Sequence, residues 1–421
     1  MQLFSEHNQQ FPVTKNLIIC ILFSCTLHHN SQSQDQFGFV MPPNQNRVII
    51  PFENYNNLVI IPVIINNLLK VKFVLDTGVE TPILTEEGFA GLLGIQYIRK
   101  ISISGLGIED SVNAFVGNRV KFTLPGGVIG HNLNLLVLEE DYLKLSEKLG
   151  EEVYGIIGYD LFKQFVVEIN YNEKLVILHR PEKFRVKKRM IRKSLDIIRS
   201  KPYISAFITQ EKEKDTVRLM IDSGASHAML LDVNQTTIST PSKVIDARLG
   251  TGLAGPIPGT LGRIDHLSLD HLEFKHVIAS FPKLDAYSQV IKRGSRQGTI
   301  GGEILSRVQP IFDYPNQAIY LRKSKKFNSP FETDMSGISL ITQGAFLDTL
   351  AVEYIRPNSP SHFAGVKVHD IVLSVNGHSV RGSSLANTQA ILKKRQNYKI
   401  KLRLLRDGEK LKKVFRLKRA I

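Results

Sequence analysis

Short runs of apolar residues, rich in β-branched side chains, recur along this chain between clusters of Asn, Gly, Asp and Pro. Residues 59–65, 166–169 and 400–405 show the pattern clearly. Such runs between turn formers are typical of β-strands, and only short stretches, at 141–149 and 385–394, have helical character. The pattern therefore predicts a mostly β fold. The length of 421 residues, 43% of them hydrophobic, predicts about two to four domains.

Two of the apolar runs end in the same way. Val74-Leu75 leads into Asp76-Thr77-Gly78, and Met220-Ile221 leads into Asp222-Ser223-Gly224, and the two aspartates are 146 residues apart. A single triplet of this kind is ordinary turn chemistry. Two of them in matching surroundings predict two carboxylates that a pseudo-symmetric chain brings together.

The surroundings of the two triplets match in order and spacing. Each aspartate is followed by a glycine-containing loop, a strand-like run, an apolar element ending in glycine, and a tyrosine at a turn. These features are 104–107, 120–124, 156–158 and Tyr171 in the first half, and 251–255, 264–269, 299–301 and Tyr314 in the second. The glycines of the third feature follow the aspartates by 82 and 79 residues. This agreement predicts an internal duplication.

The duplicated pattern resembles the retropepsin-like aspartic proteases, specifically exported bacterial proteins with two such lobes in one chain and a C-terminal PDZ domain. The resemblance covers about residues 47–421. It implies two pseudo-symmetric β-barrel lobes, with Asp76 and Asp222 as the catalytic carboxylates. In this family a small Ala or Ser usually follows the triplet, as Ala225 does here, whereas the first lobe has Val79.

The same resemblance assigns supporting roles around the aspartates. Thr77 and Ser223 would brace the two active loops against each other, and Gly78 and Gly224 would permit the tight loop backbone. The elements at 156–158 and 299–301 would pack beneath these loops.

Elementary chemistry supports the same activity. Two carboxyl groups about 3 Å apart cannot both ionise easily, so they share one proton. The ionised partner can take a proton from water while the protonated partner donates to the scissile carbonyl. We therefore predict an aspartic endopeptidase without metal or cofactor. The alternative is a catalytically inactive protein that binds peptides in the same cleft.

Glycine-rich segments predict flaps over the cleft. Gly105 and Gly107 in the first half, and Gly250 and Gly252 in the second, are predicted at hairpin tips that close over an extended peptide. Residues 250–255 also match the dinucleotide fingerprint G-x-G-x-x-G, but two prolines follow where that fingerprint requires a helix. The flap interpretation is therefore preferred.

Histidines at positions 266, 271 and 276 do not indicate a metal site. Their spacing of five fits a hairpin that turns near Asp270 better than a set of ligands on one face.

The N-terminus predicts export. Lys15 precedes an apolar run that reaches about Leu27, which is too short to span a bilayer comfortably but fits a signal-peptide core. The expected location is periplasmic or extracellular, with a lipid anchor at Cys25 as the second-ranked alternative. Cys20 and Cys25 are the two cysteines of the chain, so a mature protein cleaved beyond them has no disulfide, catalytic thiol or thiolate zinc site.

The last part of the chain resembles a bacterial PDZ domain. The motif at 358–371, followed by Asn376-Gly377, carries the resemblance. It implies that Gly337, Ile338, Ser339 and Leu340 form the loop that receives a peptide's terminal carboxylate. The predicted domains are a leader at 1–36, a first protease lobe at 37–184, a linker at 185–200, a second lobe at 201–327 and the PDZ domain at 328–421.

Charge adds little to this prediction. The net charge of +15 is scattered through strands and the linker, and no nucleic-acid-binding motif accompanies it. The expected partners are therefore a peptide or protein substrate and a C-terminal peptide for the PDZ domain, with no nucleic acid. Because both triplets lie in one chain, a monomer is expected.

Overall fold

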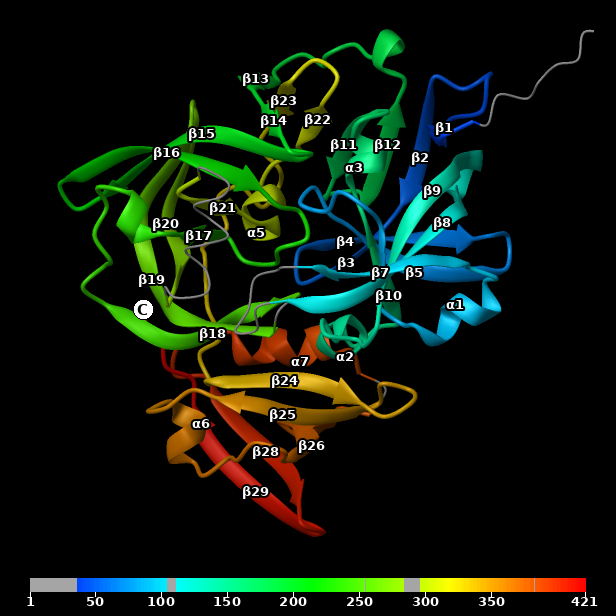
Figure 1. Ribbon diagram of the computed structural model, residues 1–421. Helices are drawn as coiled ribbons and strands as arrows, with labels where there is room; N and C mark the ends of the chain where they lie inside the picture. The colour runs from blue at the N-terminus through cyan, green and yellow to red at the C-terminus, as the bar shows by residue number, and fades with distance from the viewer. Residues whose placement is uncertain (1–35, 104–110, 254, 284–295, 382) are drawn as a thin grey trace, which may run out of the picture. The chain divides into compact units, whose positions relative to one another are not determined.

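The computed structural model describes residues 36–103, 111–253, 255–283, 296–381 and 383–421. Figure 1 shows that they form mostly strands with a few short helices, which confirms the predicted mostly β fold. The predicted strands at 59–65, 166–169 and 400–405 are found within β4, β11 and β28. Residues 1–35 of the predicted leader, including Cys20 and Cys25, and the predicted first flap, with Gly105 and Gly107, lie outside the described residues.

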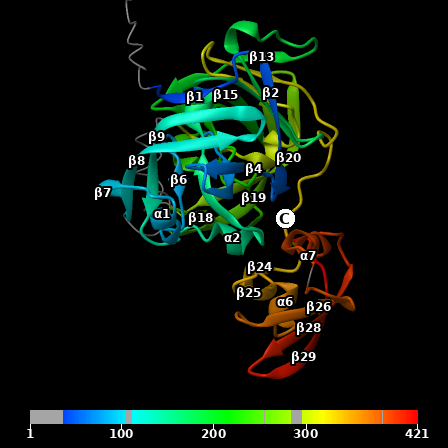
Figure 2. The same ribbon diagram turned by 90° about the vertical axis from the view of Figure 1, so that its right-hand side faces the viewer.

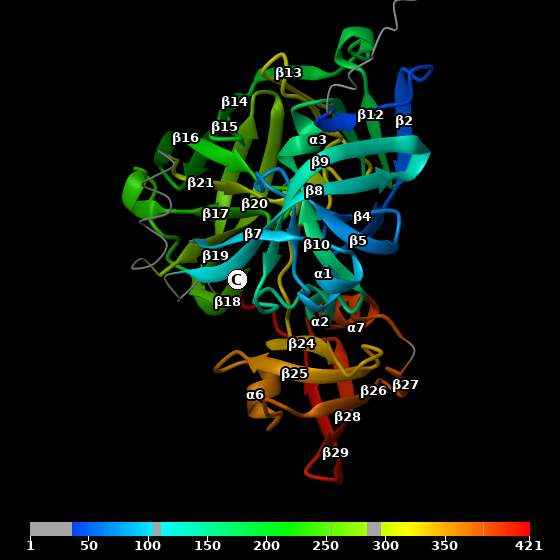
Figure 3. The ribbon, with the colours of Figure 1, turned by 45° about the vertical axis from the view of Figure 1, so that its right-hand side comes forward.

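The first lobe is a sheet that closes on itself. Its strands are β1 (Gly38–Val40), β3 (Glu53–Tyr55), β4 (Leu58–Ile65), β5 (Leu69–Leu75), β6 (Ile83–Leu84), β7 (Tyr97–Ile103), β8 (Val112–Leu124), β9 (Val128–Leu138) and β10 (Val153–Ile157). The ring runs β9-β6-β10-β5-β4-β8 and is closed by pairing of β8 with β9, the long cyan hairpin of Figure 3. Largely alternating buried and exposed positions along β8 direct one face into the core.

The second lobe repeats this ring strand for strand. Its strands are β14 (Asp196–Ile198), β15 (Lys201–Gln210), β16 (Glu213–Ile221), β17 (Met229–Leu231), β18 (Val244–Gly252), β19 (Gly255–Leu269), β20 (Leu272–Pro282) and β21 (Gly298–Ile300). The order β20-β17-β21-β16-β15-β19, closed by β19 on β20, matches the first ring. The parallel pair β5–β10 corresponds to the parallel pair β16–β21. The two halves are thus folded copies of one unit.

A third sheet joins the two lobes. It runs β13-β23-β22-β11-β12-β2. Its strands are β2 (Arg47–Pro51), β11 (Val166–Asn170), β12 (Leu175–His179), β13 (Ile191–Ser194), β22 (Ile311–Asp313) and β23 (Ala318–Leu321). β11 from the first half pairs directly with β22 from the second. The predicted linker at 185–200 contributes β13 to this sheet, and one continuous hydrophobic core includes residues of both lobes.

Helical elements are short. They are α1 (Gly88–Leu92), α2 (Leu145–Leu149), α3 (Tyr159–Phe162), α5 (Gly302–Leu305), α6 (Pro360–Phe363) and α7 (Leu385–Leu392), with 3₁₀ turns η1 (Pro125–Gly127), η2 (Pro181–Lys183) and η3 (Val233–Gln235). The helix predicted at 141–149 begins later than expected because Lys144 adopts the left-handed conformation, with φ of 51°, and stops the helix from extending toward Asp141. The helix predicted at 385–394 is confirmed as α7.

The C-terminal segment that was predicted to be a PDZ domain has its own sheet and core. Its strands are β24 (Ile338–Gln343), β25 (Thr349–Ile355), β26 (Ile371–Val375), β27 (His378–Ser379), β28 (Lys399–Arg406) and β29 (Glu409–Arg416). The sheet runs β24-β25-β26-β28-β29, and Figure 2 shows it in orange to red together with α6 and α7. Leu385 and Leu392 of α7 pack in the hydrophobic cluster of this domain.

Candidate active site

The two predicted aspartates lie at equivalent ends of equivalent strands. Asp76 follows β5 and Asp222 follows β16. The amide of Asp76 donates to the carbonyl oxygen of Ile157 at 2.8 Å, and the amide of Asp222 donates to that of Ile300 at 2.9 Å. Each loop is therefore held by the parallel strand beside it, in the same way in both lobes.

Two hydroxyl side chains lock the loops to each other. The amide of Thr77 donates to Ser223 Oγ, and the amide of Ser223 donates to Thr77 Oγ1, both at 3.0 Å. The Thr77 hydroxyl in turn donates to the carbonyl of Ile221, and the Ser223 hydroxyl donates to that of Leu75, both at 2.8 Å. Both side chains are fully buried, where such bonds are worth most. The four bonds fix the positions of the aspartates relative to each other.

The triplet glycines leave room for the carboxyl groups. The amide of Gly78 donates to Asp76 Oδ1 at 2.6 Å, and that of Gly224 donates to Asp222 Oδ1 at 3.0 Å. A Cβ atom on Gly224 would lie 2.3 Å from Asp76 Cγ. The Asp76 carboxyl therefore lies directly against the loop that carries Asp222.

The glycines behind the loops are equally constrained. A Cβ atom on Gly158 would lie 1.8 Å from the carbonyl oxygen of Asp76, and one on Gly301 would lie 2.2 Å from that of His227. Val79 makes the same type of backbone hydrogen bond as its counterpart Ala225. The carbonyl of Val79 accepts from the first amide of α3, and the carbonyl of Ala225 accepts from the first amide of α5. The larger side chain lines the cleft without altering the loop.

The electrostatics of the pair favour a shared proton. Burial first, and the negative charge of Asp222 next, raise the pKa of Asp76 well above its ordinary value, while the amide of Gly78 opposes the shift. Asp76 therefore tends to stay protonated where an isolated aspartate would ionise. One neutral carboxyl can then donate while its partner accepts.

The aspartates lie in a cleft of about 400 Å³. Gly250 and Gly252 line it from the hairpin of β18 and β19, whose tip pairs Gly252 with Gly255. The described residues on either side of this tip thus form a hairpin and not the start of a helix, as predicted. Predicted flap residues Gly105 and Gly107 cannot be placed, since they lie outside the described residues.

Two residues near the aspartates were missed by the sequence analysis. His227 lines the cleft with Nε2 buried and unpartnered, and burial lowers the pKa of its imidazole. Tyr314 lies behind the pair, stacked on Phe162 at 5.2 Å between ring centroids, and burial first, with the charge of Asp76 next, raises the pKa of its phenol. The position of His227 in the second active loop could have identified it as a residue of the site. Tyr314 was predicted from the sequence only as a turn residue.

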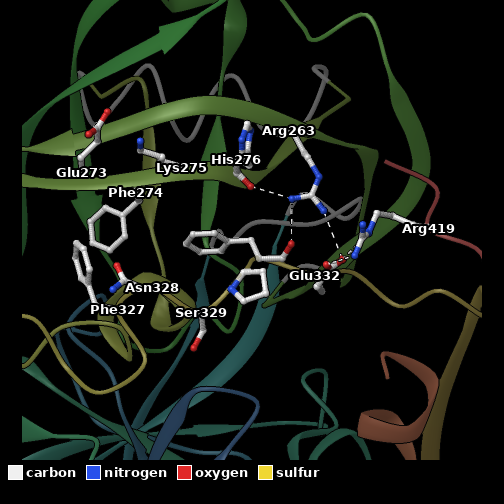
Figure 4. A pocket seen from close by; sticks show the side chains of 12 residues that line it. Arg263, Glu273, Phe274, Lys275, His276, Phe327, Asn328, Ser329, Glu332 and Arg419 are labelled. Atoms are coloured by element: carbon white, nitrogen blue, oxygen red, sulfur yellow. Dashed lines mark hydrogen bonds and ion pairs between the residues drawn. The ribbon is translucent and has the colours of Figure 1, made fainter. Parts of the chain in front are cut away.

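A second pocket lies away from the aspartates. Figure 4 shows this cavity of about 470 Å³, with Arg263 and Glu332 among its lining residues. Arg263 donates to the carbonyls of His276 and Phe331 and forms an ion pair with Glu332 at 3.6 Å, and Arg419 also pairs with Glu332. Arg263 and Arg419 are thus both paired with Glu332 in this pocket.

The histidine-containing hairpin forms as predicted. Leu269 pairs with Leu272 on either side of the turn at Asp270, which has φ of 56°. In the part of the chain that the structure describes, no cluster of His, Cys, Asp and Glu is suited to hold a metal ion. Nor does any described helix have the length and apolarity needed to cross a membrane.

The predicted carboxylate loop leads into β24 of the C-terminal domain, with Gly337 just before the strand and Ile338 as its first residue. The amide of Gly337 donates to the Asp334 carboxylate, and the amide of Ile338 donates to Ser336 Oγ at 3.0 Å. Ser339 and Leu340 lie in β24, at a bulge in its pairing with β25. Two of the four predicted amides thus already have acceptors within the loop.

Comparisons with known proteins agree with this geometry. The family model described as aspartyl protease matches residues 61–161, and the PDZ domain model matches residues 334–414. The chain is also similar to the carboxy-terminal processing protease CtpA of Bacillus subtilis (strain 168), with 29% identity over 126 residues. That match covers 30% of this chain and 26% of the relative, so the similarity spans about a quarter of the relative's length. The chain therefore carries an aspartyl protease domain and a C-terminal PDZ domain.

Proposed function

We propose that this protein is an aspartic endopeptidase in which Asp76 and Asp222 together activate water. The reciprocal bonds of Thr77 and Ser223 carry the proposal, because they hold the two carboxyl groups side by side in a cleft. Such a rigid arrangement costs no reorganisation when charge develops in the transition state.

The proposed reaction divides the work between the carboxyl groups. The ionised partner takes a proton from a water molecule bound between them, and that water attacks the peptide carbonyl. The protonated partner donates to the carbonyl oxygen as the tetrahedral intermediate forms. The apparent pKa values belong to the pair, so no fixed role is given to either residue.

The first prediction tests the pair directly. Asp76→Asn and Asp222→Asn should each abolish cleavage in a peptide-library digestion analysed by mass spectrometry, and the double variant should be scarcely worse, because the two groups act as a unit. Asp270→Asn, in an exposed turn of the second lobe, is the matched control. Wild-type turnover in either single variant would refute the shared pair. Peptide binding without cleavage by the parent protein would favour the inactive peptide-binding alternative.

We further propose that residues 1–36 direct export, with the mature chain in the periplasm or outside the cell. The apolar run that ends near Leu27 supports this proposal. N-terminal sequencing of the protein from fractionated cells tests it, and Cys25→Ser separates cleavage from lipid anchoring. An uncleaved chain confined to the cytoplasm would contradict it.

A further inference from the structure

Arg296 is a buried cation on the wall of the active-site cleft. Its side chain is only 4% exposed and it lines the same cavity as Asp76 and Asp222. Nη1 contacts the sulfur of Met220, while the buried Nε has no hydrogen-bond partner among the residues that the structure describes. Among the residues that the structure describes, none forms an ion pair with Arg296.

The corresponding wall of the first lobe is apolar. Thr299 pairs with Met220 on the parallel strand, as Ile156 pairs with Val74, so Thr299 and Ile156 are equivalent. Arg296 lies three residues before Thr299, whereas the strand before Ile156 begins at Val153 and is irregular between Val153 and Gly155. Val153 and Ile156 belong to a hydrophobic cluster on the first-lobe side. The two sides of the cleft therefore offer different chemistry to a bound chain.

The remaining charges of the cleft add to its positive charge. Lys148 of the first lobe and Lys201 of the second also line it, and Asp76 and Asp222 are the only carboxyl groups among the described residues that line it. Since the aspartates share a proton in the proposed mechanism, they cannot neutralise three cations. The described lining therefore has an excess of positive charge.

A buried guanidinium is unfavourable when one of its N–H groups faces only a thioether sulfur, which is a weak acceptor, and another has no acceptor. A carboxylate supplied by a ligand would satisfy it, because the planar fork of arginine matches a carboxylate in two parallel hydrogen bonds. Glutamine or other neutral side chains can accept only a weaker bond.

We propose that Arg296 is a specificity-determining residue that selects peptides with a glutamate or aspartate side chain on the second-lobe side of the scissile bond. The residue on the other side of that bond then contacts the apolar first-lobe wall around Ile156. This inference rests on the proposed endopeptidase function, and it adds the substrate class to that function.

Cleavage of a peptide library by the full-length protein tests the proposal. The parent protein should prefer an acidic residue at one of the two positions flanking the cleaved bond and an apolar residue at the other. For matched Glu and Gln peptides, the ratio of kcat/KM values should be about 10 to 100. Arg296→Gln should reduce that ratio to about 1. Arg296→Lys, which keeps the positive charge, should retain part of the preference for the Glu peptide.

Arg263→Gln is the matched control, because it removes a second-lobe arginine that lines the other pocket (Figure 4). It should keep the acidic preference. Thermal unfolding of each variant verifies that it is folded. Cleavage without acidic preference, or a preference that survives Arg296→Gln, would overturn the inference while leaving proteolysis intact.

A binding measurement separates this failure from failure of the proposed function. Glu and Gln peptides are titrated into the full-length Asp222→Asn protein, with and without Arg296→Gln, and followed by fluorescence anisotropy. Tighter binding of the Glu peptide, lost with Arg296→Gln, supports the inference even if the parent protein cleaves nothing. Equal binding of the two peptides overturns it.

Discussion

At Asp76, burial and the neighbouring negative charge act in the same direction. Burial first, and Asp222 next, raise its pKa above the ordinary 3.8. A carboxyl group whose pKa is raised by folding contributes stability that is present below its unfolded pKa and lost as pH rises through the folded pKa. The ionised site therefore reduces the free energy of unfolding at neutral pH.

We accordingly expect Asp76→Asn to unfold at a higher temperature than the parent at pH 7. The asparagine side chain cannot ionise, and its oxygen can still accept a hydrogen bond from the backbone amide of Gly78. The difference should shrink as pH falls through the raised folded pKa of Asp76 toward 3.8, and it should change no further below that value. Circular dichroism melts across pH measure it. A variant that is less stable than the parent at pH 7 would contradict the stated cause.

At the scale of elements, the sheet between the lobes depends on one buried carboxylate. Glu168 of β11 is fully buried and accepts from Lys187 Nζ at 2.7 and 2.8 Å, with His179 and Gln309 also in contact. Burial opposes ionisation, but the bonds from His179 and Lys187 prevail and lower the pKa of Glu168 from 4.5 to about 2. The carboxylate thus links β11, the segment before β13 and the second half of the chain.

Glu168→Gln should therefore destabilise the protein by about 3 kcal/mol at pH 7, since the lowered pKa reports that much preference for the charged form. This contribution is present above pH 4.5 and is lost as pH falls toward 2, so the two proteins should converge in acid. Urea unfolding at several pH values measures the difference. Glu139→Gln, which breaks the exposed pair with Lys100, should have a smaller effect. An equal loss in both variants would rule out the assigned role of Glu168.

The local sequence pattern was sufficient to predict individual strands and hairpins. It was insufficient to predict how distant strands pair with each other. Alternation and turn residues located β4, β11 and β28, because these signals act between near neighbours. The pairing of β11 with β22 depends on packing of two distant halves, and no local signal specifies it. The repeat located Asp76 and Asp222, whereas Arg296 belongs to no motif and is recognisable only by its burial in the cleft.

At the scale of the molecule, one chain contains both halves of the site. The bonds between Thr77 and Ser223 and the pairing of β11 with β22 are all intramolecular. We therefore expect kcat/KM for a cleaved peptide to be independent of protein concentration, and sedimentation velocity to show a monomer. Specific activity that rises together with dimer formation would contradict this expectation.

The PDZ domain has β24 at the edge of its sheet. β24 pairs with β25 and is the last strand on its side of the sheet, and α2 of the first lobe packs against it through a hydrogen bond from Thr342 Oγ1 to the carbonyl of Glu147 at 2.9 Å. A peptide that adds to β24 by backbone hydrogen bonds therefore has to fit beside α2. The loop before β24 already directs the amide of Gly337 to the Asp334 carboxylate. A peptide's terminal carboxylate that accepts a hydrogen bond from the Gly337 amide must therefore replace Asp334 as the acceptor. It is also repelled by the negative charge of the Asp334 carboxylate.

This competition predicts an unusual pH dependence for the PDZ domain. Burial raises the pKa of Asp334, so acidification neutralises it early and removes the repulsion. A peptide with a free C-terminal carboxylate should bind more tightly at pH 5 than at pH 7, and its amidated form should bind about tenfold more weakly. Asp334→Asn should strengthen binding of the free acid at pH 7 and reduce the pH dependence.

Fluorescence anisotropy with the intact chain measures these affinities. A truncated chain is unsuitable, because Phe331 and Ile421 pack in the core shared by the protease lobes. The Asp222→Asn background prevents cleavage of the probe in the proposed active site. Equal affinity for free-acid and amidated peptides would remove the carboxylate loop from the binding mechanism. Strand addition to β24 would then have to rely on backbone bonds and side-chain contacts alone.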